Sequence, residues 1–387
     1  MSSTAPPASA ECVIVGGGVV GCSLAYHLAR GGMRPLLLER GGLGEGSTAR
    51  NAGGVRQQFS TEVNVRVGML SHRMLERFPE EIGATADLRE IGYLFLAGTA
   101  EEAEQFARNV EMQHRVGLRE AELLDVERAR ELVPELRTDD LHAATFCPSD
   151  GLAGPNEVTG GYAAAARRLG AAVVEGCEVA EVTRDRGRVS GVRTTAGERV
   201  SAGIVVNCAG PYASVVGRMA GVEIPVRPFR RHIFVTEPFR LSRPVPFTVD
   251  FHTSFYMHPE GEGLLLGMSD PDEPASFDTS VSWDFLEHLI EHATWRVPAL
   301  ERAEIHTGWA GLYEVSPDNQ AIVGESPQLA GLWLCCGFSG HGFMQAPAMG
   351  HLLAEVLLGR EPEIDLSPFD PARFEQGEGL QPESAVI

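Results

Sequence analysis

The stretch CVIVGGGVVGCSLAYHLARGGMRPLLLE, residues 12–39, decides how this chain folds. Its first four residues, 12–15, are apolar and predict a buried strand. A helical pattern follows over 22–30, and a second apolar strand over 36–38 ends at Glu39. A strand, a glycine-rich turn, a helix and a second strand within about 30 residues predict a βαβ unit that binds a dinucleotide.

The turn of this unit contains the pattern Gly-x-Gly-x-x-Gly. The first glycine permits the tight turn, the second lets a pyrophosphate approach the backbone, and the third lets the helix pack on the sheet. The acid that ends the second strand can accept hydrogen bonds from a ribose hydroxyl and disfavours the 2′-phosphate of NADP, which leaves FAD and NAD. The residues expected to contact the cofactor here are Gly16, Gly18, Val19, Val20, Gly21 and Glu39.

The composition excludes several classes of protein. With 32 basic and 53 acidic residues the net charge is −21, which argues against a nucleic acid or an anionic membrane surface as the partner. No run reaches 18 apolar residues, so we expect no membrane span. All 32 basic residues are arginine, so no lysine can form a Schiff base, act as a general base or activate oxygen.

Seven cysteines lie mostly in apolar runs, and none forms a Cys-x-x-Cys pair. We expect reduced thiols, with neither a disulfide framework nor a metal site. The first eleven residues, MSSTAPPASAE, contain no basic or long apolar region, which is unlike a signal peptide. These features predict a cytoplasmic protein.

Patterns farther along the chain predict the remaining elements. Apolar runs indicate strands at 172–174, 179–184, 204–207 and 332–335, and alternation indicates an antiparallel sheet at 232–236, 255–258 and 264–266. Helical patterns cover about 61–78, 100–132, 157–169, 283–295 and 346–358, and the tail after about 374 is expected to be loose.

The interleaving of these elements predicts an α/β fold with two domains, each discontinuous in sequence. One is a Rossmann-like nucleotide-binding domain built from 11–83, 151–218 and 311–387. The other is a substrate-binding domain with a mixed, mainly antiparallel sheet, built from 84–150 and 219–310. We expect the ligand at the interface between the two domains.

Five segments, spread over nearly the whole chain, point to one family. They are VIVGGGVVGCSLAYHLA (13–29), GSTARNAGGVRQQFS (46–60), VVNCAGPYA (205–213), SFYMHPEGEGLLLGMSD (254–270) and, most specifically, GFSGHGFMQAPAMGHLLAEVLLG (337–359). Together they resemble the D-amino-acid oxidase superfamily of FAD enzymes, and within it most closely monomeric sarcosine oxidase and its amine-oxidising relatives. The resemblance implies FAD as the cofactor.

The resemblance also implies which residues contact FAD. Backbone amides at Gly342, Phe343 and Met344 would face the pyrimidine oxygen, where reduced flavin carries negative charge. The backbone of Val179 would meet the adenine. His341 is either a flavin-edge residue or a loop histidine held by its neighbours. The further implied contacts are Arg40, Ser47, Thr48, Ala209, Gly210 and Gly340.

Three residues are expected to act on the substrate. Arg56 matches the family arginine that binds the substrate carboxylate, and the alternative is a surface arginine paired with an acid such as Glu62. Phe255 matches a family tyrosine over the flavin, and the alternative is a core aromatic. Met344 stands where sarcosine oxidase has a second carboxylate-binding group, a lysine. Residues 230–232, Arg-Arg-His, we interpret as a half-exposed strand rather than an anion site.

Two further departures from the family pattern concern the flavin. Leu265 replaces the lysine that promotes reaction of reduced flavin with oxygen, which favours a dehydrogenase over a fast oxidase. Gly311 replaces the cysteine that is linked to the flavin, and the loop 41–60 contains no histidine that could form such a link. We therefore expect non-covalent FAD.

The resulting hypothesis is oxidation of a C–N bond in an amino acid or N-alkyl amino acid, such as sarcosine or proline. Hydride would pass from Cα to flavin N5, and the imine would hydrolyse in water. A protein or a quinone would then accept the electrons. Two alternatives stay open: a 2-hydroxy acid dehydrogenase of the same superfamily, and a flavoprotein subunit or assembly partner with little activity of its own.

Overall fold

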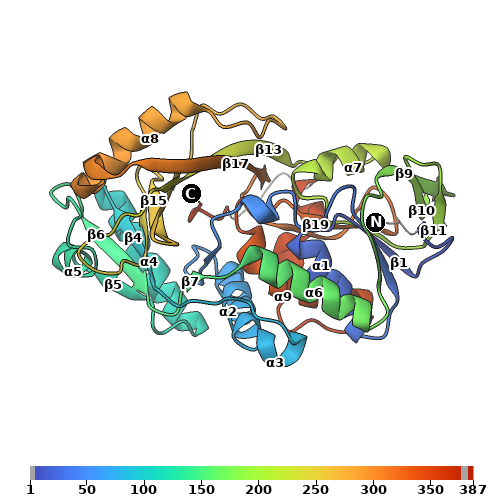
Figure 1. The fold of residues 1–387 in the computed structure, drawn as a ribbon. Coiled ribbons are helices and arrows are strands. Elements are labelled where there is room, and N and C mark those ends of the chain that lie inside the picture. Colours follow the sequence, from blue (N-terminus) through green and yellow to red (C-terminus); the bar gives the residue numbers. More distant parts are fainter. Residues whose placement is uncertain (1–4, 376–381, 387) are drawn as a thin grey trace.

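The computed structural model describes residues 5–375 and 382–386, which form two lobes (Figure 1). The first lobe is built on β1 (Cys12–Val15), β2 (Pro35–Leu38), β8 (Ala172–Val174), β12 (Val205–Asn207), β18 (Ile322–Glu325) and β19 (Leu332–Cys336). These strands form one sheet in the order β18-β19-β12-β1-β2-β8. Five of them run parallel, and β18 is antiparallel to β19.

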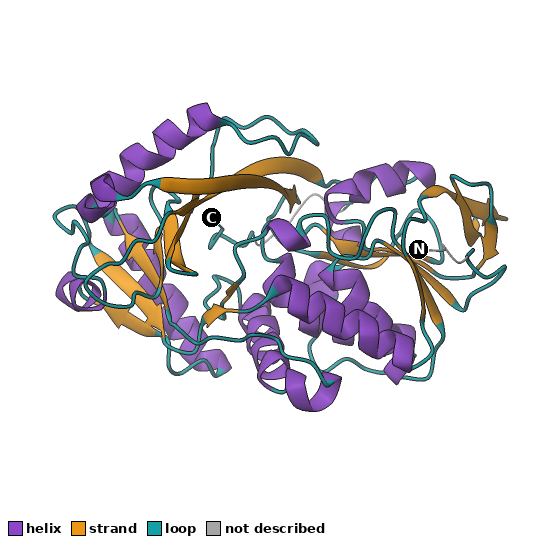
Figure 2. Ribbon diagram, viewed as in Figure 1, coloured by secondary structure: helices purple, strands orange, loops and turns teal. Residues whose placement is uncertain are grey.

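Both faces of this sheet are covered (Figure 2). One face carries α1 (Val19–Arg30), α6 (Pro155–Arg168) and α9 (Gly342–Leu357), with α2 (Glu62–Glu76) and α3 (Phe78–Ile82) packed on them. The other face carries α7 (Ala213–Met219) and a small antiparallel sheet of β9 (Val179–Asp185), β10 (Arg188–Thr194) and β11 (Arg199–Ser201). Strand β1 is therefore apolar throughout, because both of its faces are buried.

The second lobe is built on an eight-stranded sheet. Its members are β4 (Tyr93–Ala97), β5 (Glu122–Leu124), β6 (Ala143–Cys147), β13 (Arg227–Thr236), β14 (Phe247–Asp250), β15 (Tyr256–Glu260), β16 (Gly263–Met268) and β17 (Ile305–Val315). The order is β17-β13-β16-β15-β14-β4-β6-β5, and only the β14–β4 pair is parallel. Helices α4 (Ala100–Val116), α5 (Val126–Leu132) and α8 (Trp283–Arg296) pack around it, and β3 (Gly54–Val55) pairs with β7 (Gly151–Leu152) between the lobes.

Alternation along the strands gives the large sheet two different faces. Phe255 and Met257 point into the core beneath α8, together with Phe234. Tyr256, from the same stretch of chain, belongs to a second cluster on the opposite face, with Phe247. This second face is the one turned toward the first lobe.

The structure confirms the expected α/β architecture and most of the expected elements. The pattern over 100–132 is not one helix, because Gly117 adopts a left-handed φ of +115° and ends α4. Strands β4 and β6 are missing from the sequence prediction, since a short apolar run does not distinguish a strand from a buried helix. Strand β17 crosses the domain boundary that we expected between residues 310 and 311.

The seven cysteines are buried, and none is in a disulfide among the described residues. In the described part of the chain, no helix combines the length and the apolar character needed to cross a membrane.

Part of the tail that was expected to be loose is packed between the lobes, where Figure 1 marks the C-terminal end. Residues 376–381 lie outside the described residues. Glu383 is fully buried, and its carboxylate accepts hydrogen bonds from Ser60, Thr61 and Asn64. The backbone carbonyl of Ala385 accepts a hydrogen bond from Arg56.

Candidate active site

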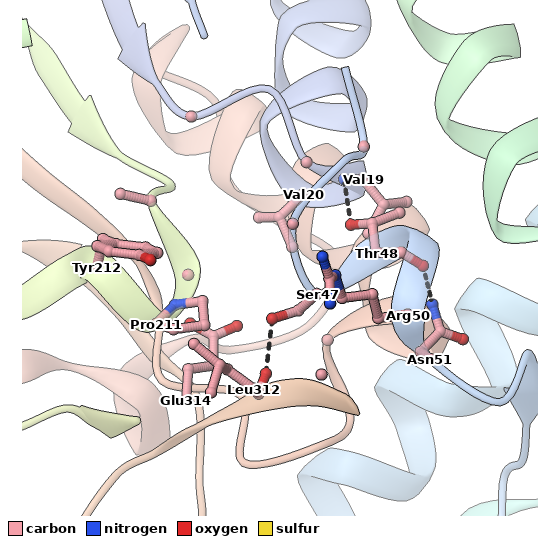
Figure 3. Close-up of a pocket in the computed structure, with 18 of the residues that line it drawn as sticks. Val19, Val20, Ser47, Thr48, Arg50, Asn51, Pro211, Tyr212, Leu312 and Glu314 are labelled. Atoms are coloured by element: carbon pink, nitrogen blue, oxygen red, sulfur yellow. Dashed lines mark hydrogen bonds between the residues drawn. The ribbon is translucent and has the colours of Figure 1, made fainter. Parts of the chain in front are cut away.

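A cavity of about 520 Å³ is lined by residues of both lobes, and Figure 3 shows part of its wall. Its size is within the roughly 300–1,000 Å³ range of ligand pockets. Most of the residues predicted from the sequence lie in this wall. They are Gly16, Gly18, Val19, Val20, Glu39, Arg40, Ser47, Thr48, Val179, Ala209, Gly210, Gly340, Gly342, Phe343 and Met344.

The glycine turn at the start of α1 has the geometry that its pattern predicts. Gly16 adopts a φ of +111°, and a Cβ there would lie 2.4 Å from the carbonyl oxygen of Cys208. Gly21 does not line the cavity; a Cβ there would lie 2.0 Å from the Gly16 carbonyl oxygen, so this glycine allows the helix to pack. The amide of Val19 donates to Thr48 Oγ1 at 3.1 Å, which ties the following loop to the turn (Figure 3).

Glu39 and Arg40 lie together at the nucleotide end of the cavity. The two carboxylate oxygens of Glu39 accept hydrogen bonds from the amides of Gly17 at 2.7 Å and Gly41 at 2.8 Å. The guanidinium of Arg40 lies 3.8 Å from the ring centre of Tyr212, which reaches the cavity from the other half of the nucleotide fold. An acid and a stacked arginine are thus fixed where the second strand ends.

A second helix begins at the same cavity. Helix α9 starts at Gly342, and Gly342, Phe343 and Met344 of its first turn line the wall. Amides of a first turn have no partner within the helix, so they are free to bind an acceptor. Gly340 permits this approach with a φ of +93°, and a Cβ there would lie 2.4 Å from the ring of Tyr313.

These residues fit FAD. The N-termini of α1 and α9 open into one cavity, and each carries a partial positive charge that favours an anionic group. The wall continues from Val179 and Met219 at one end to Tyr256 and Phe247 at the other, which suits an elongated dinucleotide.

Arg56 lies outside the cavity, contrary to the expectation that it faces the substrate. Its side chain is 1% exposed and donates hydrogen bonds to the backbone carbonyls of Gln58 and Ala385. The acid considered as its alternative partner, Glu62, pairs with Arg115 instead, at 3.3 Å. Arg56 is thus a buried cation that the chain satisfies with its own backbone.

His341 belongs to the same buried cluster and does not line the cavity. Its Nε2 lies 3.0 Å from a guanidinium nitrogen of Arg56, and its ring meets Phe59 edge-on. Because a guanidinium only donates, Nε2 is the unprotonated nitrogen. Burial, with the Arg56 charge as a second cause, holds the pKa of His341 well below its usual value. The structure therefore favours the loop histidine held by its neighbours.

Phe255 also lies away from the cavity, in the core beneath α8. Its neighbour Tyr256 lines the cavity instead. Successive residues of a strand point to opposite faces, so a shift of one residue in the alignment exchanges the core side for the ligand side. The alternative of a core aromatic is the one that the structure supports for Phe255.

The aromatic wall at this end of the cavity consists of residues other than the predicted Phe255. It consists of Tyr93, Phe247, Tyr256 and Tyr313, and the rings of Tyr93 and Phe247 stack with centres 4.1 Å apart. Burial raises the pKa of all three tyrosines, so their phenols stay protonated. Tyr256 lies in the quoted segment 254–270, whereas Tyr93, Phe247 and Tyr313 come from strands β4, β14 and β17.

Glu314 is a further cavity residue that the sequence did not reveal. Its carboxylate accepts a hydrogen bond from the amide of Gly337 at 2.8 Å. Burial nevertheless raises its pKa to about 7, although the amides of Gly337 and Phe338 act in the opposite direction. Figure 3 shows Glu314 on the same wall as Pro211 and Leu312.

Arg50 connects the loop after β2 to the second lobe. Its guanidinium donates to the carbonyl of Ala310 at 2.8 Å, and its own carbonyl accepts from Trp309 Nε1 at 3.0 Å. Gly311 lies beside it, and a Cβ there would be 3.0 Å from Arg50 Cβ. These two hydrogen bonds hold the loop against β17 at the cavity wall.

Comparison with known proteins gives one consistent family. The model of the family described as FAD dependent oxidoreductase (DAO) matches residues 11–356. Human mitochondrial sarcosine dehydrogenase is 33% identical over 386 residues, which covers 95% of this chain. Glycine oxidase from Geobacillus kaustophilus is 30% identical, covering 94% of this chain and 97% of its own length.

Solved structures agree with these relatives. L-proline dehydrogenase from P. horikoshii has a TM-score of 0.90 and 34% identity, and the match covers 96% of this chain and 100% of that one. The chain spans only 42% of the length of human sarcosine dehydrogenase. Because the family model covers most of the sequence, and because the cavity has two helix N-termini suited to a dinucleotide, the chain belongs to the family of FAD-dependent oxidoreductases.

Proposed function

We propose that this chain oxidises the C–N bond of an amino acid or N-alkyl amino acid, with a secondary amine such as sarcosine or proline preferred. One observation carries the proposal: a single cavity, into which two helix N-termini open, runs from a nucleotide-type end to an end walled by aromatic rings. The names of three relatives support it, since sarcosine dehydrogenase, glycine oxidase and L-proline dehydrogenase all refer to amino acids.

The residues at the nucleotide end would hold FAD. The amide of Val20 would bind the pyrophosphate, beside the Val19 amide that donates to Thr48, while Glu39 would bind a ribose hydroxyl and the first turn of α9 the pyrimidine oxygens. Bound FAD would supply the acceptor for the two electrons and the hydrogen that leave the substrate carbon.

The aromatic end would receive the substrate. Tyr93, Phe247 and Tyr256 offer an apolar wall that displaces water from the reacting carbon. The phenols of Tyr93 and Tyr256 would stay protonated, since burial raises the pKa of both, and would serve as hydrogen-bond donors rather than as bases. The oxidised product, an imine, would meet water on leaving and hydrolyse.

The proposal includes slow reaction with oxygen. Leu265, at the position of the family's oxygen-activating lysine, is buried in the apolar cluster of Phe247 and Tyr256. It offers no positive charge to stabilise developing superoxide. A protein or a quinone would then reoxidise the flavin.

The decisive experiment is anaerobic reduction of the FAD-loaded protein, followed at the oxidised flavin band. The panel contains sarcosine, N,N-dimethylglycine, L-proline, glycine, D-alanine and lactate, with free FAD as the control. We expect a secondary-amine amino acid to bleach the band fastest, and readmitted air to restore it more slowly than an artificial quinone does.

Each other outcome contradicts a defined part of the proposal. Bleaching by lactate alone would support a 2-hydroxy acid dehydrogenase. No bleaching by any compound would support a subunit role without its own activity. Reoxidation by air at the rate of turnover would identify an oxidase.

A further inference from the structure

Arg231 reaches the cavity because of its place on β13. Neighbouring Arg230 and His232 point to the other face, where Arg230 pairs with Glu273 at 3.1 Å and His232 packs near α8. Arg231 points the opposite way and lines the cavity together with Ile233. The stretch 230–232, interpreted from the sequence as a strand without an anion site, thus places one arginine in the cavity wall.

The guanidinium of Arg231 is poorly satisfied by the protein. One terminal nitrogen donates to the carbonyl of Arg230 at 2.9 Å, and the buried Nε has no hydrogen-bond partner. Among residues 5–375 and 382–386, no carboxylate lies within 4.0 Å of it, whereas Arg230 has two acids, Glu273 and Asp278. A partly buried cation with one backbone acceptor, an unpaired Nε and no carboxylate partner among the described residues is costly, so this arrangement favours an anionic ligand.

The space around Arg231 suits a small carboxylate. The guanidinium carbon lies 5.1 Å from the ring centre of Tyr313, and Tyr256 lines the same cavity. The residue paired with Arg231 on β17 is Gly311, which adds no side chain of its own beside the guanidinium; Arg50 packs against this glycine. The planar group can bind both oxygens of a carboxylate, and an aromatic surround strengthens that interaction by excluding water.

We infer that Arg231 binds the carboxylate of the substrate, in the role that the family resemblance gives to Arg56. This inference rests on the proposed function, which supplies an amino-acid substrate. Arg56 is already bonded to backbone carbonyls outside the cavity. Of the other arginines in the wall, Arg40 stacks on Tyr212 at the nucleotide end, and Arg50 donates to the backbone of β17.

The test uses two ligands of one shape. Pyrrole-2-carboxylate is a flat carboxylate without a hydrogen on its α-carbon, and pyrrole-2-carboxamide is its uncharged counterpart. Each is titrated into FAD-loaded protein by calorimetry and by the change in the flavin spectrum. The proteins are wild type, Arg231→Met, Arg231→Lys, Arg56→Met and, as a matched control, Arg227→Met, which changes an exposed arginine of the same strand.

We expect Arg231→Met to weaken pyrrole-2-carboxylate binding about 10- to 100-fold and to leave the carboxamide unchanged. Arg231→Lys should recover part of the loss, and Arg227→Met should behave as wild type. With a reducing amino acid, Arg231→Met should raise KM far more than it lowers the limiting rate of flavin reduction.

The inference is overturned if the carboxylate fails to bind wild type, if Arg56→Met rather than Arg231→Met abolishes binding, or if Arg231→Met weakens both ligands equally. Failure of the proposed function has a different signature. In that case carboxylate binding depends on Arg231, but no amino acid of the reduction panel bleaches the flavin.

Discussion

Glu314 lines the cavity and has a pKa of about 7, so its charge changes near neutral pH. Its carboxyl group is ionised in water at pH 7, but burial in the cavity raises its pKa from 4.5 to about 7. Between these two values the unfolded chain has lost the proton and the folded chain still holds it. Folding is therefore linked to proton uptake in this window.

We predict that this linkage is visible in a Glu314→Gln variant. As pH rises from 4.5 to 7, the free energy of unfolding of wild type should fall relative to that of the variant, and the difference should stay level above pH 7. Thermal melting of both apoproteins across this range measures it. Glu361→Gln, at an exposed acid, should show no such divergence, and parallel curves for Glu314→Gln would refute the raised pKa.

At the residue scale, the sequence predicts contacts made by the backbone better than contacts made by side chains. Gly16 and Gly18 of the first turn and residues 342–344 line the cavity, whereas Gly21 does not; these backbone positions follow from local conformation. Phe255 and Arg56 lie elsewhere, because the face of a strand residue and the partner of a buried arginine depend on distant segments. Neighbouring residues of a strand point to opposite faces, so Tyr256 and Arg231 could be assigned to the cavity face only once the register of their strands was known.

At the scale of elements, residues 382–386 act as a packed segment rather than a tail. Glu383 places a fully buried carboxylate against donors from the start of α2 and the loop before it. The amide of Glu383 donates to Asp318, so the segment also touches the loop before β18. One acid thereby connects three separate parts of the chain.

We predict that Glu383→Ala lowers the free energy of unfolding by about 2–4 kcal/mol, since several buried donors lose their acceptor at once. Ser384→Ala, at an exposed neighbour, should change it by less than about 0.5 kcal/mol. Thermal melting gives the comparison. Limited proteolysis near residue 385 should become faster only in the Glu383 variant, and equal rates would contradict a fastening role.

Elements with local signals were predictable, and elements defined by distant pairing were not. The unit from β1 to β2 is complete within about 30 residues, so its periodicity is sufficient. Strand β4 is defined by its pairing with β14, which lies about 150 residues away in sequence, and β6 by its pairing with β4 and β5. A parallel pairing such as β4 with β14 leaves no turn signal between the two strands.

For the whole molecule, the two lobes share one cavity, and FAD should therefore stabilise the assembled fold. Removal of FAD should lower the melting temperature, and added FAD at 100 times its Kd should raise the free energy of unfolding by about 2.7 kcal/mol.

Because Gly311 offers no thiol, acid denaturation should release all flavin into the supernatant. Yellow colour that stays in the precipitate would indicate a covalent bond.

The order of strands in the first lobe also affects how the protein is made. Strand β1 (Cys12–Val15) is synthesised before the other strands of its sheet, yet it pairs with β12, which in turn pairs with β19 (Leu332–Cys336). At roughly 5–20 residues per second, about 15–65 seconds separate the synthesis of β1 from that of β19. During this interval a growing chain exposes an unpaired apolar strand edge, which chaperones recognise. The flavin can be enclosed only after α9 (Gly342–Leu357) emerges, so the supply of FAD matters after this helix has been synthesised rather than when β1 emerges.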